Sequence, residues 1–380
     1  MIKYIDDNVE LEGKRVLLRL DLNVPIEDGV VMDPYRLERA IETVDFLRAK
    51  KAQTIIIAHC EGKDSTTLAP MWHYLNGYFP VEFCPTFFTP ESVSKLLELK
   101  DGGVLLFENV RNNTGEKEND PEFAKKLSQM ADMYVNDAFS VSHRKHASIV
   151  GVTEFLPHYA GLLMRQEIEH LSKAFDPLRP FLFILGGAKF DTKLPIIQKY
   201  LVSADNVFVG GALANNFLKE KGLEIGTSLV DEGEFEIKEM LQKNGDNNSG
   251  KLLLPIDVTV QDAAETISFK KVTEVLPTDY IGDVGSKTLE MLKPYIVAAK
   301  TIVWNGPLGN YEKGFTDKTE QLAEMISQSN ATTIVGGGDT LASIKKLGID
   351  DKFTFISTGG GAMLDFLVDE TLVGIDALNK

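Results

Sequence analysis

The sequence predicts an α/β protein of two doubly wound parallel-sheet lobes, joined by a helix and hinge. Short apolar, β-branched runs alternate with longer helix-like stretches along a chain of 380 residues. This alternation is typical of parallel strands linked by crossover helices. One open sheet holding all eleven runs would exceed the usual size, and a single core rarely grows beyond about 250–300 residues. Two Rossmann-like lobes are therefore expected.

The predicted strands form two groups along the chain. The first group is RVLLRLDLNV, TIIIAHC, VEFCP, VLLFENV and MYVNDAF, and the second is FLFILGG, NVFVGG, LLLPIDV, TIVWNGP, TTIVGGG and FTFISTGGG. Between them, Leu163, Glu167 and Leu171 share one helix face, so this stretch is either a helix between the lobes or one more helix of the second lobe. We expect an N-terminal lobe at 1–159, an interlobe helix at 160–176, a C-terminal lobe at 177–365, and a segment at 366–380 that returns to the N-terminal lobe.

The composition is that of an ordinary globular protein, with 43% hydrophobic and 25% charged residues. The net charge of -16 repels nucleic acid and anionic membranes, so an anionic ligand needs locally concentrated arginines and lysines. Cys60 and Cys84 form no C-x-x-C pair. The first residues do not resemble a signal peptide, and no apolar run is long enough to span a bilayer. These features predict a cytoplasmic protein that binds neither nucleic acid nor membranes.

Polar side chains follow the predicted strands of the first lobe, at the sheet edge where open α/β sheets bind ligands. They are Arg19, Asp21, Asn23, His59, Asn109, Arg111, Asn136 and Asp137, and nearby loops add Arg36, His143, Arg144, Lys145 and His146. Guanidinium groups match carboxylate and phosphate oxygens, so converging arginines predict a small, multiply charged anion. Each arginine alone could also be a solvated or ion-paired surface group, and His59 alone a structural histidine.

Glycines follow the strands of the second lobe instead. They occur at Gly186-Gly187, Gly210-Gly211, Gly306-Pro307, Gly336-Gly337-Gly338 and Gly359-Gly360-Gly361. A single pair could be a plain tight turn. Five such loops at one sheet edge predict a phosphate cradle, because glycine lets backbone amides and helix N-termini approach a ligand closely.

Three charged residues accompany these loops. Lys189 is expected in the first turn of a helix, where its charge opposes the helix dipole. Lys193 lies one turn further on the same helix face. The two lysines either bind successive phosphates or lie on an exposed helix. Asp339 is either the N-cap of the next helix or a ligand of the magnesium that accompanies nucleotide phosphates. The motifs G-x-x-x-x-G-K-[ST] and G-x-G-x-x-G do not occur after a strand, and Gly285 to Thr288 is expected to cap a helix.

At these strand ends the chain resembles phosphoglycerate kinase almost from end to end. The matching segments are LLRLDLNVP, LLFENVR, NDAFSVSHRKHAS, AGLLM, ILGGAK, VGGALANNFLK, LPIDV, KTIVWNGPLG, VGGGDT and ISTGGGA. The resemblance implies reversible transfer of the acyl phosphate of 1,3-bisphosphoglycerate to MgADP, giving 3-phosphoglycerate and MgATP, with domain closure and direct in-line transfer. It also implies a glycolytic enzyme that acts as a monomer with Mg²⁺.

The resemblance assigns residues to each ligand. The phosphoglycerate site would be Asp21, Asn23, Arg36, His59, Arg111 and Arg144. The nucleotide site would be Gly187, Lys189, Lys193, Gly211, Pro307, Glu312, Gly338, Asp339, Thr340, Gly359, Gly360 and Gly361, with Glu312 on the ribose and Asp339 on magnesium. Arg36, Lys189, Gly337 and Gly360 would act on the transferred phosphoryl group.

The chain departs from the family pattern at three places. The family usually reads His-Leu-Gly-Arg-Pro where this chain reads His59-Cys60-Glu61-Gly62-Lys63, so Lys63 would replace a substrate-binding arginine. Thr192 separates Asp191 from Lys193, and Asn310-Tyr311 replaces the usual Val-Phe before Glu312. The altered His59 segment motivates an alternative, a catalytically weakened nucleotide-binding relative with an interaction or regulatory role. A kinase for another small acid is the third hypothesis.

Overall fold

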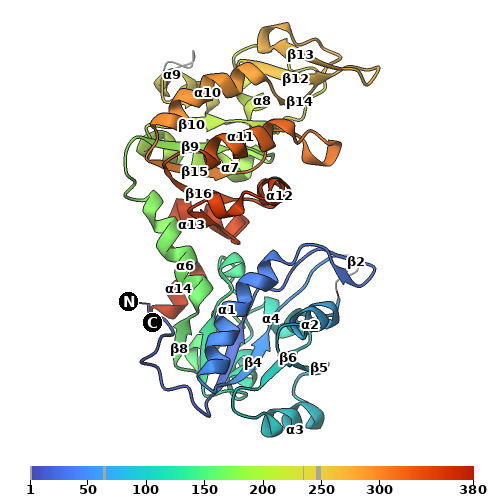
Figure 1. Cartoon of the computed structure of the whole chain (residues 1–380), viewed down its shortest axis with the longest axis vertical. Helices are drawn as coiled ribbons and strands as arrows, with labels where there is room; N and C mark the ends of the chain where they lie inside the picture. The colour runs from blue at the N-terminus through green and yellow to red at the C-terminus, as the bar shows by residue number, and fades with distance from the viewer. Residues whose placement is uncertain (1, 63–65, 234, 245–249) are drawn as a thin grey trace. The chain divides into compact units, whose positions relative to one another are not determined.

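The computed structural model describes residues 2–62, 66–233, 235–244 and 250–380. The chain divides into two compact units (Figure 1): unit 1 comprises residues 1–169 and 369–380, and unit 2 comprises residues 170–368. The chain passes from unit 1 to unit 2 inside helix α6 (Leu162–Leu171), whose first turn is bound to unit 1. There, the Asp137 carboxylate accepts a hydrogen bond from the Met164 amide at 2.9 Å.

The core of unit 1 is a six-stranded parallel sheet in the order β5-β6-β4-β1-β7-β8. Its strands are β1 (Arg15–Arg19), β4 (Gln53–Ile57), β5 (Glu82–Cys84), β6 (Val104–Phe107), β7 (Met133–Asn136) and β8 (His158–Ala160). Every residue of β6 and β7 is buried, as in parallel sheets that are covered on both faces. The sequence predicts all of these strands except β8, whose three residues form no apolar run.

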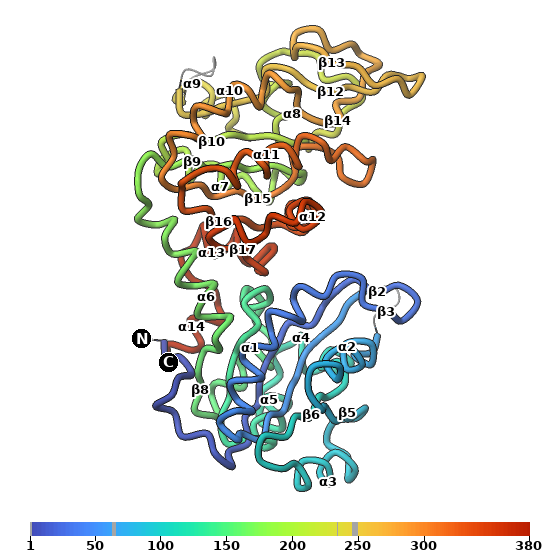
Figure 2. Tube along the Cα trace, viewed as in Figure 1, coloured from blue at the N-terminus to red at the C-terminus, as the bar shows by residue number. Residues whose placement is uncertain are grey.

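Helices and one small hairpin complete unit 1. They are α1 (Tyr35–Ala49), α2 (Ala69–Leu75), α3 (Pro90–Glu98), α4 (Thr114–Lys117), α5 (Pro121–Ser128), α14 (Val373–Leu378) and the hairpin β2 (Ile26–Glu27) and β3 (Val30–Val31). Figure 2 shows α14, near the C-terminus, beside β8 and the N-terminal end of the chain. The Gly374 amide donates to the Ser142 carbonyl at 2.8 Å, and Ala377 is buried against Ile149 and Val150.

The core of unit 2 is a second six-stranded parallel sheet, in the order β11-β10-β9-β15-β16-β17. Its strands are β9 (Phe181–Leu185), β10 (Asn206–Val209), β11 (Leu252–Leu253), β15 (Thr301–Asn305), β16 (Thr332–Gly336) and β17 (Phe355–Ile356). The chain builds outward from β9 in one direction and then from β15 in the other. A crevice therefore forms at the carboxyl ends of β9 and β15, where doubly wound sheets bind their ligands.

Unit 2 also carries a three-stranded antiparallel sheet, β13-β12-β14, that the sequence reading missed. Its strands are β12 (Asp257–Gln261), β13 (Ile267–Lys271) and β14 (Tyr280–Val284). The run LLLPIDV, predicted as one strand, is divided between β11 and β12. Pro255 lies at the division because proline cannot donate to a strand ladder.

The helices of unit 2 connect these strands. They are α7 (Phe190–Ser203), α8 (Gly211–Glu220), α9 (Ile237–Asn244), α10 (Ser286–Ala298), α11 (Asp317–Ser327), α12 (Gly338–Leu347) and α13 (Gly361–Asp369). The predicted cap at Gly285–Thr288 is confirmed: Gly285 is the N-cap of α10, and the Asp257 carboxylate accepts from the Lys287 and Thr288 amides at 3.0 and 2.7 Å. Within the described part of the chain, none of the helices is long and apolar enough to cross a membrane.

Candidate active site

The glycine loops of unit 2 pack backbone against backbone at the crevice between β9 and β15. The Gly187 amide donates to the Pro307 carbonyl at 2.7 Å, and the Gly186 amide donates to the Asn305 carbonyl at 2.8 Å. Gly211 has a φ of +62°, and a side chain there would come within 2.6 Å of the Gly187 nitrogen. Larger residues would push these loops apart, so the glycines permit the close approach that the sequence predicts.

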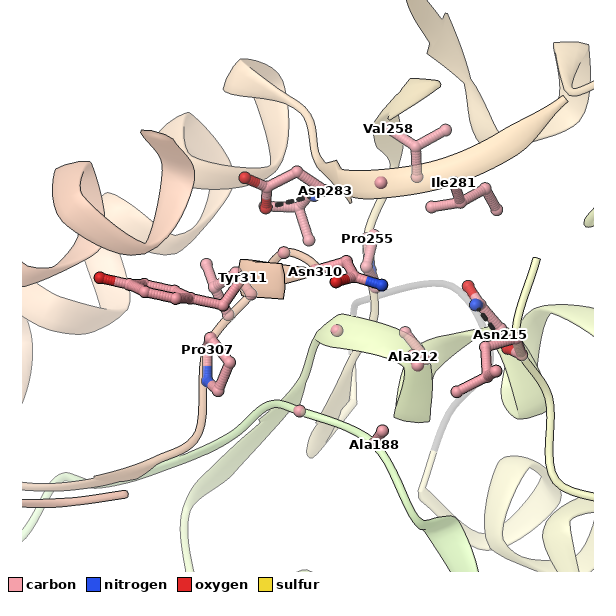
Figure 3. A pocket seen from close by; sticks show the side chains of 18 of the residues that line it. Ala188, Ala212, Asn215, Pro255, Val258, Ile281, Asp283, Pro307, Asn310 and Tyr311 are labelled. Atoms are coloured by element: carbon pink, nitrogen blue, oxygen red, sulfur yellow. Dashed lines mark hydrogen bonds between the residues drawn. The ribbon is translucent and has the colours of Figure 1, made fainter. Parts of the chain in front are cut away.

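A pocket of about 290 Å³ lies against these loops. Figure 3 shows Val258 and Ile281, from the antiparallel sheet, across from Ala188 and Ala212 on the glycine-loop side. Other lining residues are Gly187, Gly211, Asn215, Leu218, Leu229, Tyr280, Asp283, Pro307, Asn310, Tyr311, Glu312 and Asp339. A mostly apolar pocket with a few polar groups is typical of a site for a small organic molecule.

Two lysines lie at the start of α7, beside the glycine loop. Lys189 is the N-cap, with a left-handed φ of 64°, so it precedes the first turn in which the sequence places it. The Lys193 ammonium donates to the Gly186 carbonyl at 2.7 Å. Burial, with a smaller effect from Lys189, lowers the pKa of Lys193 to about 8, although Asp339 opposes the shift. A buried cation near a second cation favours binding of an anion such as phosphate.

Asp339 is the second residue of α12, whose N-cap is Gly337, so the alternative that Asp339 is the N-cap is wrong. As an acid in the first turn it still interacts favourably with the helix dipole. Burial and the charge of Glu312 raise the pKa of Asp339, against the opposing charge of Lys193. Asp339 therefore interacts electrostatically both with Glu312, which lines the same pocket, and with Lys193.

Two further loops present backbone groups at the same sheet edge. Gly337, with a φ of +103°, precedes α12, and Gly360, with a φ of +53°, precedes α13. These left-handed conformations suit glycine. Thr340, in the first turn of α12, is fully buried, and its hydroxyl has no hydrogen-bond partner among the described residues.

In unit 1, Asp21 organises the loop that follows β1. Its carboxylate accepts hydrogen bonds from the Ser140 hydroxyl and, at 3.0 Å, from the Asn23 amide, and it forms an ion pair with Arg36 at 3.2 Å. Burial alone would raise the pKa of Asp21, but Arg36, His59 and these hydrogen bonds outweigh burial and lower it. Arg36 also donates to the Asn23 carbonyl at 3.0 Å. The Asp21 carboxylate thus holds Arg36 at the carboxyl edge of the sheet.

His59, after β4, is buried and uncharged. Burial and the charge of Arg19 lower the pKa of His59 to about 2. The Arg19 guanidinium lies 3.3 Å from the His59 Nδ1 atom, and because arginine can only donate, Nδ1 accepts and Nε2 carries the proton. His59 therefore keeps one N–H donor.

Arg111 and Arg144 approach each other around the carboxylate of Glu61. Arg111 forms an ion pair with Glu61 Oε1, and Arg144 lies 3.9 Å from Oε2. The Arg111 side chain is only 4% exposed, and its Nε and Nη2 nitrogens have no hydrogen-bond partner in the described part of the chain. A buried guanidinium with unused donors is suited to a strongly anionic ligand.

Comparison with known proteins decides the family. The sequence model of the phosphoglycerate kinase family matches residues 5–370. The chain belongs to the phosphoglycerate kinase family. Phosphoglycerate kinase from Dictyoglomus turgidum is 41% identical, and the match covers 97% of this chain and 96% of the relative. Phosphoglycerate kinase from Clostridium beijerinckii is 42% identical, and the match covers 99% of this chain and 98% of the relative. The structure of phosphoglycerate kinase from Pyrococcus horikoshii has a TM-score of 0.88 at 32% identity and covers 100% of this chain and 98% of its own. The structure of phosphoglycerate kinase from Coxiella burnetii has a TM-score of 0.84 at 35% identity and covers 98% of this chain and 97% of its own.

Membership of the phosphoglycerate kinase family confirms the predicted fold class and the prediction of a phosphotransferase with a carboxyl acceptor. These comparisons give no support to the alternative of a catalytically weakened relative.

The predicted site residues fall into two sets, one in each unit. Around the pocket of unit 2 lie Gly187, Gly211, Pro307, Glu312 and Asp339. In unit 1, Asp21, Asn23, His59 and Arg144 lie in loops at the carboxyl edge of the sheet or close to it, and Arg111 lies in a short 3-10 helix. The expectation that Arg36 lies in a loop is wrong, because Arg36 is in the first turn of α1. Lys63 lies outside the described residues.

Several polar strand-end residues of unit 1 have structural partners instead. Asp137 binds the first turn of α6, and Asn109 caps a short 3-10 helix by accepting from the Arg111 amide at 3.1 Å. Arg19 is fully buried, and its Nε donates to the Ser148 hydroxyl at 2.9 Å. These side chains support the loops at this edge of unit 1 from within.

Sequence reasoning missed two features of the site. The first is the pocket wall formed by β12 and β14. The sequence signal for this sheet is the alternating pattern of ISFKK, which forms β13 and pairs with β12. The second is Glu61, an acid directly after a strand end among arginines. The strand-end rule that selects His59 also applies to Glu61.

Proposed function

We propose that this chain transfers the acyl phosphate of 1,3-bisphosphoglycerate to MgADP, reversibly, and that the residues described above bind the two substrates. One observation supports the assignment most strongly: a single chain of this family presents the buried donors of Arg111 beside one sheet, and beside the other a glycine-lined pocket with Lys189 and Lys193 next to its glycine loop. Three-carbon acid phosphates need the first kind of site, and nucleotides need the second.

In unit 1, Arg36, Arg111 and Arg144 would hold the carboxylate and phosphate groups of phosphoglycerate. Asp21 would orient Arg36, since the two side chains are 3.2 Å apart. The Nε2–H of His59 would donate to a substrate oxygen. Arg36 would also extend toward the transferring phosphoryl group, where a bidentate donor stabilises developing charge.

In unit 2, the apolar pocket would hold the adenine ring, with Glu312 near the ribose hydroxyls. Lys193 and the amides near Gly360 would bind nucleotide phosphates, and Lys189 would neutralise the transferred phosphoryl oxygens. Among the described residues no group of three or more His, Cys, Asp or Glu side chains could hold a metal ion. Asp339 would contribute a carboxylate to Mg²⁺, which accepts one or two carboxylates and takes its other ligands from phosphates and water.

Direct transfer requires the reacting atoms to approach to about 3–3.5 Å with water excluded. Because the two substrates bind different units, we propose that the units close during catalysis and that a monomer suffices.

The deciding experiment is a coupled assay of ATP formation from 1,3-bisphosphoglycerate and MgADP, with a panel of other small carboxylic acids in the reverse direction. Lys189→Ala should lower kcat by roughly 10²-fold or more, because it removes a preorganised charged donor. Lys219→Met, on an exposed position of α8, is the matched control. Faster turnover of another acid than of 3-phosphoglycerate would overturn the substrate assignment, and normal kcat in Lys189→Ala would overturn the role of Lys189.

A further inference from the structure

A carboxylate occupies the centre of the cationic cluster in unit 1. Glu61 forms an ion pair with Arg111, lies 3.6 Å from the Lys117 ammonium, and lies 3.9 Å from Arg144. Three cations from three different segments of unit 1 thus face one acid. Two of them, Arg111 and Arg144, are the residues proposed above to bind the anionic substrate.

The backbone around Glu61 is fixed, so this contact does not depend on a loose loop. The Glu61 amide donates to the Asn23 side-chain oxygen at 2.9 Å. One residue earlier, the Cys60 carbonyl accepts from the Asn109 side chain at 2.9 Å. Two strand-end asparagines therefore hold the main chain from either side, and the carboxylate reaches the cations from a defined origin.

The charges show that Glu61 is ionised in this position. Burial would raise the pKa of Glu61, but Arg111, Arg144 and Lys117 outweigh it and lower the pKa below its usual value. The side chain is nevertheless 45% exposed, whereas Arg111 is 4% exposed. The guanidinium of Arg111 is thus held in place by its burial, whereas the carboxylate of Glu61 faces solvent and can rotate away from Arg111.

We propose that Glu61 is a built-in competitor of the substrate: its carboxylate takes the place of a substrate anion on Arg111 and Arg144 and must be displaced when phosphoglycerate binds. This inference rests on the proposed function, because it takes the arginine cluster as the phosphoglycerate site. When the substrate displaces Glu61, one ion pair with the arginines replaces another. Glu61 therefore weakens binding of phosphoglycerate and leaves the rate of phosphoryl transfer unchanged. It also keeps inorganic anions from occupying the buried arginine.

The test is Glu61→Gln, which keeps the shape of the side chain and removes its charge. The KM for 3-phosphoglycerate should fall roughly two- to fivefold, the range expected from losing a partly exposed ion pair. The KM for ATP and kcat should stay unchanged. Inhibition by inorganic phosphate and sulfate should strengthen by a similar factor, and calorimetric titration of the full chain with 3-phosphoglycerate should show the same gain in affinity.

Two further variants separate this role from a structural one. Glu61→Asp keeps the charge but shortens its reach, so it should give an intermediate KM. Glu98→Gln, at the end of α3, removes one charge from unit 1 at a carboxylate that accepts from Ser94, and should change nothing. An unchanged or increased KM in Glu61→Gln would show that Glu61 merely supports Arg111 and would overturn the proposal. Failure of the unmodified chain to phosphorylate 3-phosphoglycerate would instead overturn the proposed function.

Discussion

If Lys193 binds a nucleotide phosphate, as proposed, nucleotide binding must depend on pH, and the size of the effect can be calculated. Its ammonium is largely buried and donates to the Gly186 carbonyl, and its pKa is lowered from the usual 10.5 to about 8. A bound phosphate adds negative charge next to the ammonium and restores the higher pKa. Only the protonated lysine attracts phosphate strongly, so raising the pH above 8 removes the proton from the free protein and weakens binding.

The magnitude follows from linkage between protonation and binding. At pH 9.5, which is 1.5 above a pKa of about 8, roughly one free molecule in 30 keeps its proton on Lys193. The affinity for MgADP should therefore fall about thirtyfold between pH 7 and pH 9.5, or about 2 kcal/mol at about 1.36 kcal/mol per pH step. At pH 7 itself, Lys193→Met should weaken MgADP binding roughly ten- to hundredfold, as expected for a charged hydrogen bond of about 1.5–3 kcal/mol.

The assay is calorimetric titration with MgADP at pH 7, 8, 9 and 9.5, using the full chain, Lys193→Met and Lys219→Met. The control Lys219→Met should keep both the affinity and the pH dependence. Lys193→Met should bind weakly and equally at every pH, and thermal unfolding at each pH shows that the variants are folded. If Lys193→Met keeps the same pH dependence, another group titrates and the role given to Lys193 is wrong.

Three other predictions follow from the site. Asp339→Ala should weaken binding of MgADP more than binding of metal-free ADP, and equal losses in titrations with and without magnesium would exclude a metal role. Lys63→Ala should raise the KM for 3-phosphoglycerate roughly tenfold or more, the effect of losing a charged hydrogen bond, with little change in the KM for ATP. An unchanged KM would mean that Arg36, Arg111 and Arg144 suffice to hold the anion. Solution scattering should show compaction when both substrates are bound in a non-reacting complex, because water must leave before transfer, and identical profiles would contradict closure.

The sequence predicts those parts of the fold and site that depend on local order along the chain. A buried strand followed by Gly186-Gly187, or by Asp21 and Asn23, is visible as a short pattern, and parallel sheets bring such strand ends to one edge. The two sheets and the positions of the glycine loops could therefore be predicted without coordinates.

The remaining features depend on which distant segments meet. The wall formed by Val258 and Ile281 requires β12 to pair with β14, although β13 lies between them in the sequence. The contact of Glu61 with Arg111 and Arg144 joins segments that follow β4, β6 and β7. The strand-end rule places each residue near the sheet edge, but no single segment shows that the three side chains meet. Long-range pairing of this kind is decided by packing, so local patterns reveal it only after the topology is known.

The return of α14 to unit 1 affects the order in which the protein can fold during synthesis. Domains generally fold as units as they emerge from the ribosome, and the N-terminal one usually completes first. Here unit 1 requires residues 369–380, which are translated after the whole of unit 2. Until then Ile149 and Val150 lack the contact with Ala377. Unit 2, which is continuous in sequence, can therefore be completed before unit 1. The nascent unit 1 stays partly uncovered while unit 2 is being synthesised.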